Sequence, residues 1–161
     1  MPELLWEIES YPLEAMRELL VRVLDSGGEF ELSPKGTSML PLLQEGRDSV
    51  ILVKPPAVLS VGDVVLYQRE NGAYVLHRIV GIDGETYTMC GDNQYQPEPG
   101  IRREQILALA DRFVLDGRTV PADSAENQTY IRRHRSLRLR RYRKAMERRT
   151  ESVKRWWKRK K

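Results

Sequence analysis

The sequence predicts a mainly β protein of the α+β class, in which an antiparallel β domain lies between an N-terminal helix and a basic C-terminal helical tail. Short apolar segments follow one another closely in the middle of the chain. The turn dipeptides Asn71-Gly72 and Asp83-Gly84 between them favour tight hairpins. Apolar residues at helical spacing occur near the two ends. The 161 residues suffice for one domain with a core and an appendage. We therefore expect three parts, residues 1–28, 29–123 and 124–161.

The N-terminal helix is predicted over residues 12–25. Its apolar residues fall on one face at spacings of three and four, and they are Leu13, Met16, Leu20, Val23 and Leu24. Pro12 suits a first helical turn, and Gly27-Gly28 ends the helix. The apolar face is expected to pack on the domain or on a partner.

The β domain is expected to contain short strands bounded by Gly, Pro, Asn or Asp. They are predicted at residues 29–32, 49–53, 63–67, 73–80, 85–90 and 108–115. Residues 102–107 are predicted to form a single helical turn. The close spacing of the strands favours antiparallel pairing.

The net charge of +4 hides two parts of opposite sign. Residues 131–161 hold 16 Lys and Arg against two acidic residues, a net charge of +14. Residues 1–130 hold 11 Lys and Arg against 21 acidic residues, a net charge of −10. Such a tail should bind an anionic surface, and Trp156-Trp157 within it favours a membrane. Nucleic acid is less favoured, because aromatic residues are not spaced along the basic run. A solvated tail without a particular ligand, or one bound to the acidic body, is the alternative.

Composition excludes several classes of protein. The single cysteine, Cys90, allows no internal disulfide framework. One cysteine and two histidines cannot supply an ordinary structural zinc site, and we expect no cofactor. No apolar run approaches the roughly 20 residues that cross a bilayer, and the acidic N-terminus is not a secretory signal. These features predict a cytoplasmic protein, or one that is peripheral at a membrane.

A candidate nucleophile is Ser38, which stands on a bend between Gly36 and Pro41. A hydroxyl on such a bend can be presented to a substrate, although the same residues also fit an ordinary turn. A serine hydroxyl is a poor nucleophile at neutral pH and needs a base within hydrogen-bond distance.

The candidate base is His77. Strand alternation puts it on one face with Val75 and Ile79, where partial burial would keep it neutral near pH 7 and able to accept a proton. The alternative is a core histidine satisfied by a backbone carbonyl. The other histidine, His134, stands among arginines with nothing to hold it near a cleft.

Two acidic residues are candidates to orient the base. A carboxylate on the imidazole nitrogen that faces away from the serine would complete a triad. Asp92 follows a strand, in the segment Gly91-Asp92-Asn93, and Glu98 lies between two prolines. Asp92 is equally compatible with an Asx turn whose carboxylate caps its own loop.

Residues 30–112 resemble the signal peptidase I family of serine proteases, because four motifs follow in the order and with the spacing of that family. They are Gly36-Thr37-Ser38-Met39-Leu40-Pro41, Gly62-Asp63-Val64-Val65, His77-Arg78-Ile79-Val80 and Gly91-Asp92-Asn93. The resemblance implies a β-rich protease fold with Ser38 as nucleophile. It also implies a peptide or protein substrate bound in extended form beside an edge strand.

The resemblance also assigns the other site residues. Most bacterial members use a lysine base, and the histidine at position 77 is similar to the endoplasmic-reticulum and archaeal type. That type adds an acidic residue in or just after the last motif, which here is Asp92 or Glu98. The oxyanion hole and the substrate cleft would be formed by Gly36, Thr37, Met39 and Pro41.

The sequence departs from the family in three respects. The Gly-Asp motif expected after Pro41 is altered here to Gly46-Arg47-Asp48. The usual membrane anchor is missing. Gly36 stands where some members have a serine that helps to bind the oxyanion, so the hole would be weaker and would depend on the backbone N–H of Ser38, with help from Thr37. A non-catalytic relative that binds a peptide or partner, and attaches by its basic tail, is therefore an alternative. A regulator related to the self-cleaving SOS repressors is a weaker one, because those use a lysine base and no helix-turn-helix motif is evident before residue 30.

Overall fold

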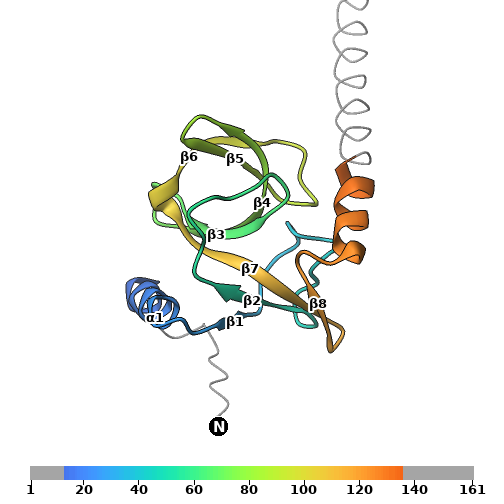
Figure 1. Ribbon diagram of the computed structural model, residues 1–161, viewed down its shortest axis with the longest axis horizontal. Helices are drawn as coiled ribbons and strands as arrows, with labels where there is room; N and C mark the ends of the chain where they lie inside the picture. Colours follow the sequence, from blue (N-terminus) through green and yellow to red (C-terminus); the bar gives the residue numbers. More distant parts are fainter. Residues whose placement is uncertain (1–12, 136–161) are drawn as a thin grey trace, which may run out of the picture.

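The computed structural model describes residues 13–135, with side chains from residue 15 onward. Over this range it forms one eight-stranded antiparallel sheet with a helix before it and a helix after it in the sequence (Figure 1). The predicted α+β, mainly β class is therefore confirmed. The paired tryptophans and most of the basic tail lie outside the described residues. No helix within residues 13–135 is long and apolar enough to cross a membrane.

The strands pair in the order β1-β2-β7-β3-β4-β5-β6, and β8 pairs with β7. Their bounds are β1 Phe30–Leu32, β2 Ser49–Val53, β3 Val64–Gln68, β4 Tyr74–Asp83, β5 Thr86–Cys90, β6 Glu98–Arg102, β7 Ile106–Leu115 and β8 Arg118–Pro121. The long strand β7 connects the two halves of the sheet. Along one edge it pairs with β2, and along the other edge its first residues pair with β3 and its last residues pair with β8.

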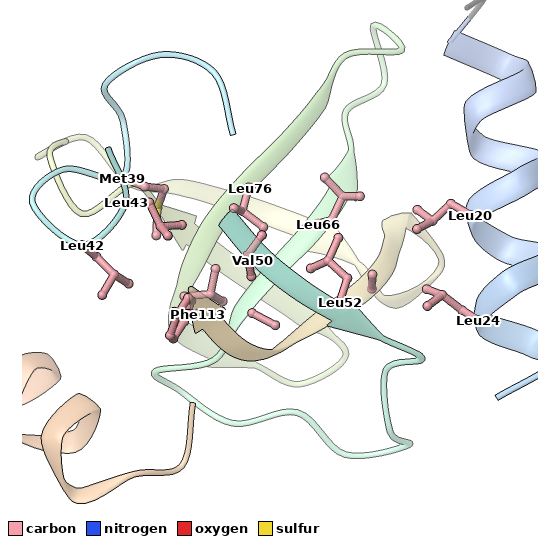
Figure 2. Packing of buried hydrophobic residues seen from close by; sticks show 13 residues of the cluster. Leu20, Leu24, Met39, Leu42, Leu43, Val50, Leu52, Leu66, Leu76 and Phe113 are labelled. Carbon is pink, nitrogen blue, oxygen red and sulfur yellow. The ribbon is translucent and has the colours of Figure 1, made fainter. Parts of the chain in front are cut away.

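Strand β3 shows how one sheet buries two apolar clusters. Val64 and Leu66 face a cluster that also receives α1 and the loop before β2 (Figure 2). The alternate residues Val65 and Tyr67 face a second cluster, formed with residues of β4, β5, β6 and β7. Side chains alternate between the two faces of a strand, and both faces of β3 are buried. The sequence of β3 is therefore a nearly continuous apolar run.

The N-terminal helix α1 (Leu13–Asp25) packs on the domain rather than being left for a partner. Leu20 and Leu24 are buried in the first cluster, and Figure 2 shows both side chains pointing toward the sheet. The helix ends at glycines, as expected. A Cβ atom on Gly28 would lie 2.9 Å from the Val23 carbonyl oxygen, so the chain leaves the helix at a residue without a side chain.

The strands β6 and β8 were not predicted from the sequence, and the observed β7 begins two residues before the predicted strand. β6 contains Pro99 and Gly100, which normally argue against a strand. It forms because it lies at the edge of the sheet, paired only with β5, where a missing backbone donor is tolerated. The expected helical turn is a 3-10 helix, Arg103–Gln105, directly before β7.

A second helix runs from residue 125 to residue 135, the last described residue. It lies on the side of the molecule opposite α1 (Figure 1). Its described part is not a free appendage, because Asn127 and His134 are buried. Ser124 begins the helix, and its hydroxyl accepts a hydrogen bond from the Asn127 backbone N–H at 3.2 Å, as expected of an N-cap serine.

Candidate active site

The serine loop, residues 36–43, connects β1 to β2 and is fastened to the turn that follows β5. The Asn93 backbone N–H donates to the Ser38 carbonyl oxygen at 2.8 Å. The Asn93 side-chain amide donates to the Thr37 carbonyl oxygen at 3.1 Å. Two segments more than 50 residues apart in the sequence are thereby held together, and Ser38 is held between them.

The remaining predicted residues of this loop have different environments. Gly36 has φ +84°, a left-handed conformation that favours glycine, and its N–H donates to Glu45 Oε2 at 2.8 Å. Thr37 and Pro41 are exposed, and the Leu40–Pro41 peptide bond is cis. Met39 was expected to shape the substrate cleft, but its side chain is buried in the first cluster. Burial of an apolar side chain is more favourable than its exposure to water, so Met39 anchors the loop to the first cluster.

The imidazole of His77 and the backbone carbonyl of Ser38 both lie close to Gly91. A Cβ atom at position 91 would lie 3.0 Å from His77 Nε2 and 2.6 Å from the Ser38 carbonyl oxygen. Only glycine fits there, and its missing side chain is what lets His77 and the serine loop come together. Within residues 15–135, Ser38 Oγ and His77 form no hydrogen bond. Such contacts commonly shorten only when a substrate is bound.

His77 is 3% exposed and lies in β4, opposite Val65 of β3. Burial, and then the positive charge of Arg69, lower its pKa from 6.5 to about 4, while Glu98 and Asp92 act in the opposite direction. The imidazole is therefore neutral at pH 7. This agrees with the protonation state expected from the sequence.

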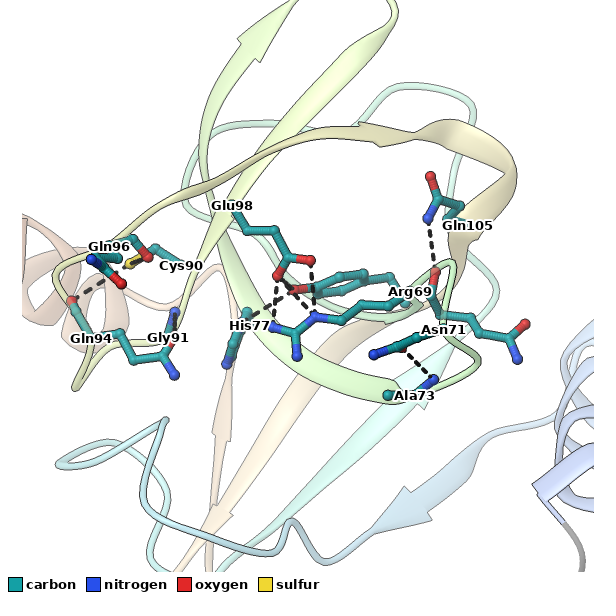
Figure 3. A network of polar contacts seen from close by, with 12 residues as sticks. Arg69, Asn71, Ala73, His77, Cys90, Gly91, Gln94, Gln96, Glu98 and Gln105 are labelled. Atoms are coloured by element: carbon teal, nitrogen blue, oxygen red, sulfur yellow. Dashed lines mark hydrogen bonds and ion pairs between the residues drawn. The ribbon is translucent and has the colours of Figure 1, made fainter.

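Glu98 is connected to His77 through a residue that the sequence analysis did not name, Tyr67. The Tyr67 hydroxyl lies 2.7 Å from Glu98 Oε2 and 3.3 Å from His77 Nδ1. Arg69 donates to both oxygens of Glu98, from Nε at 2.9 Å and from a terminal nitrogen at 2.7 Å (Figure 3). The ion pair with Arg69 is the main cause of the lowered pKa of Glu98.

Only part of the signal for Tyr67 was present in the sequence. The Asn71-Gly72 turn predicts that the strands on either side of it form a hairpin. In the structure the register places Val65 opposite His77, so Tyr67 is the diagonal neighbour of His77 on the same face. A two-residue turn at Asn71-Gly72 would instead place Leu66 opposite His77, so the observed register is needed to find this hydroxyl.

Asp92 has a different set of partners. Its carboxylate accepts two hydrogen bonds from Arg78, at 2.8 Å each, and a third from the Tyr130 hydroxyl at 3.0 Å. Neither Asp92 nor Glu98 hydrogen bonds to His77 directly within the described residues. The carboxylate of Asp92 also does not cap its own turn, since its oxygens face β4 and the helix 125–135.

His134, for which the sequence showed nothing to hold it near a cleft, lies in this second network. Only 7% of it is exposed, its Nε2 is hydrogen bonded to the Asp92 carbonyl oxygen, and its ring stacks on Tyr130 with centroids 5.4 Å apart. The guanidinium of Arg78 lies 5.6 Å from the centroid of the Tyr130 ring. The spacing of Tyr130 and His134, four residues apart on one helical face, was the overlooked signal.

The described residues contain no group of three or more His, Cys, Asp and Glu placed to hold a metal ion. Cys90 is buried at the end of β5 and its thiol lies 3.5 Å from the carbonyl oxygens of Gln94 and Gln96. A scan of the sequence against models of known protein families finds no match, and a search of curated proteins finds none either.

Proposed function

We propose that the protein is a serine endopeptidase, resembling signal peptidase I, in which Ser38 is the nucleophile and His77 the general base. The observation that carries the proposal is that the Ser38 carbonyl oxygen and His77 Nε2 both lie close to Gly91, at 2.6 Å and 3.0 Å from the point that a Cβ atom there would occupy. A core histidine satisfied by a backbone carbonyl would not need its Nε2 beside a serine loop. The low pKa of His77 also keeps it in the form that accepts a proton.

The proposed reaction is acyl transfer through a covalent intermediate. His77 Nε2 takes the proton from Ser38 Oγ as that oxygen attacks the carbonyl carbon of the substrate, and the imidazolium then gives the proton to the leaving amine. Water attacks the acyl-enzyme by the same route in reverse. The Ser38 backbone N–H has no acceptor among the described residues and is available to the oxyanion, whereas the Gly36 N–H is occupied by Glu45.

A second candidate is a non-catalytic relative that binds a peptide or a partner protein. The observations that favour it are the absence of a hydrogen bond from Ser38 Oγ to His77 within the described residues and the occupied N–H of Gly36. In both cases the ligand is an extended peptide segment, a class that rests on the motif resemblance.

Covalent labelling with a serine-directed phosphonate probe distinguishes the two candidates. The endopeptidase should be labelled at Ser38, and labelling should be lost in Ser38→Ala and His77→Ala. Ser33→Ala is the matched control, because Ser33 is an exposed serine in the same connection between β1 and β2. No labelling of the folded protein, or labelling that persists in Ser38→Ala, would overturn the proposal and favour the binding protein.

An anionic membrane surface is the partner we propose for the basic tail. In support, Arg132, Arg133 and Arg135 are exposed on the helix where the tail begins, and residues 131–161 carry a net charge of +14. The protein would then be cytoplasmic or peripheral at a membrane. Co-sedimentation with vesicles containing phosphatidylserine should fall with added salt and in the double variant Trp156→Ala, Trp157→Ala. Equal binding to neutral vesicles would contradict this assignment.

A further inference from the structure

We propose that Tyr67 is the positioning residue of the site: its hydroxyl holds His77 as the tautomer with hydrogen on Nδ1, which leaves Nε2, the nitrogen beside Gly91 and the serine loop, free to accept a proton. Glu98 and Arg69 act on the base through this hydroxyl. The kinetic consequence rests on the proposed function, whereas the tautomer is a property of the resting protein and can be measured without a substrate.

The direction of each hydrogen bond follows from the chemistry of its partners. Arg69 can only donate, and the Glu98 carboxylate can only accept. The Tyr67 hydroxyl lies 2.7 Å from Glu98 Oε2, so its single proton is directed to the carboxylate. Its oxygen then has only lone pairs to offer to His77 Nδ1 at 3.3 Å. Nδ1 must therefore carry the hydrogen, and in a neutral imidazole Nε2 is then the acceptor.

The position of the hydroxyl is set by packing. Tyr67 is fully buried in the second cluster, opposite Val75 of β4 and Ile106 of β7. Burial, followed by the neighbouring Glu98, raises the pKa of its hydroxyl, so the proton needed for the bond to Glu98 stays in place. A rigid ring held from two strands fixes the oxygen more narrowly than a flexible carboxylate side chain could.

The carboxylate is anchored from the other side. Glu98 lies in the edge strand β6, and its side chain remains 30% exposed. Alone it could adopt several rotamers, but two hydrogen bonds from Arg69 fix the plane of the carboxylate. Arg69 thus fixes Glu98, Glu98 fixes the Tyr67 hydroxyl, and this hydroxyl orients His77, which is 3% exposed. Figure 3 shows Arg69, Glu98 and His77 close together.

The test is the tautomer of His77, measured by two-bond ¹⁵N–¹H correlation on the full-length protein. The chain has two histidines, so one variant of His134 assigns both signals. The native protein should show Nδ1 protonated and Nε2 unprotonated. Tyr67→Phe keeps the ring and removes the oxygen, and should give a mixture of tautomers. Tyr87→Phe is the matched control, because Tyr87 packs against the same cluster from β5 and should leave the tautomer unchanged.

The kinetic readout is the rate of phosphonate labelling at Ser38. Tyr67→Phe should lower it about tenfold, which is part of the ~10²–10⁴-fold that a positioned general base contributes. Glu98→Gln should have a smaller effect, since its amide oxygen can still accept from Tyr67. A native protein with hydrogen on Nε2, or a folded Tyr67→Phe with an unchanged tautomer, would overturn the proposal. If the tautomers behave as expected but the native protein is never labelled, the positioning role stands and the hydrolase function fails.

Discussion

Two ion pairs between an arginine and a carboxylate lie beside the candidate base, and they have opposite environments. Arg78 and Asp92 have side chains that are 6% and 2% exposed, whereas Arg69 and Glu98 remain 37% and 30% exposed. Both pairs are doubly hydrogen bonded. Both carboxylates also accept a hydrogen bond from a tyrosine hydroxyl, from Tyr130 in the first pair and from Tyr67 in the second.

The difference indicates how the molecule separates stability from positioning. A buried pair leaves an uncompensated charge when one partner is removed, while a partly exposed pair is screened by water. Asp92 of the buried pair also binds Tyr130 and His134, so this pair lies where the helix 125–135 meets the turn that holds Ser38. The exposed pair contributes little to stability and instead directs a hydroxyl toward His77. Its tyrosine faces the base, and the tyrosine of the buried pair does not.

The largest expected effect comes from breaking the buried pair. Arg78→Met should lower the free energy of unfolding by about 3–5 kcal/mol, because Asp92 would be left charged and buried. The matched variant Arg69→Met should cost about 1 kcal/mol or less. Urea denaturation of both variants checks this. A greater loss for Arg69→Met than for Arg78→Met would reverse the comparison.

A second variant acts at the point where the two networks meet. Gly91→Ala would place a Cβ atom 2.6 Å from the Ser38 carbonyl oxygen, so the backbone would have to move. We expect the free energy of unfolding to fall by about 1–3 kcal/mol. We also expect phosphonate labelling at Ser38 to be lost. Gly81→Ala is the control, because its nearest neighbour would be at 3.5 Å, an ordinary contact. Equal labelling in both variants would mean that the site tolerates displacement of the serine loop.

Removal of one hydroxyl tests whether the two tyrosines have different roles. Tyr130→Phe takes one hydrogen bond from Asp92, which stays paired with Arg78, and should cost about 1.5 kcal/mol in the free energy of unfolding. It should leave the tautomer of His77 unchanged, unlike Tyr67→Phe. Denaturation and the ¹⁵N–¹H correlation spectrum measure the two effects. A changed tautomer in Tyr130→Phe would show that the networks are not separate.

The smallest expected effect is the dependence of stability on pH that comes from His77. Its folded pKa, lowered to about 4 mainly by burial, lies below the value of about 6.5 in an unfolded chain. The unfolded state therefore binds the additional proton first, and stability is lost as the pH falls from about 6.5 toward 4. Between pH 7 and pH 5.5 the loss is about 1 kcal/mol. The free energy of unfolding is measured against pH for the native protein and for His77→Gln, and the difference between the two profiles is the contribution of His77. Identical profiles would contradict the assigned pKa.

Local periodicity and turn residues were enough to predict α1, most of the strands, and the pairing of Ser38 with His77 as candidates. The roles of the two carboxylates were left open because they depend on contacts between distant segments. Tyr67 and Glu98 are 31 residues apart, and they meet only because β3 to β6 pair in sequence around the second cluster. No pattern within one segment could show this.

The position of His134 was missed for a related reason. Its neighbours in sequence are arginines, so local composition predicts a solvated surface, yet one face of the helix 125–135 is directed inward by Tyr130 and His134. Similarly, β6 was missed because Pro99 and Gly100 oppose a strand in isolation. The edge position that permits them is a property of the whole sheet.

The docking of the helix 125–135 on the Asp92 turn also bears on how the chain is made. During synthesis Ser38 leaves the ribosome first and His77 follows, but His134 comes 42 residues after Asp92. Until it has emerged, the turn that holds Ser38 lacks its last clamp. In a growing chain the turn that holds Ser38 would therefore be less firmly fixed until residues 125–135 have emerged.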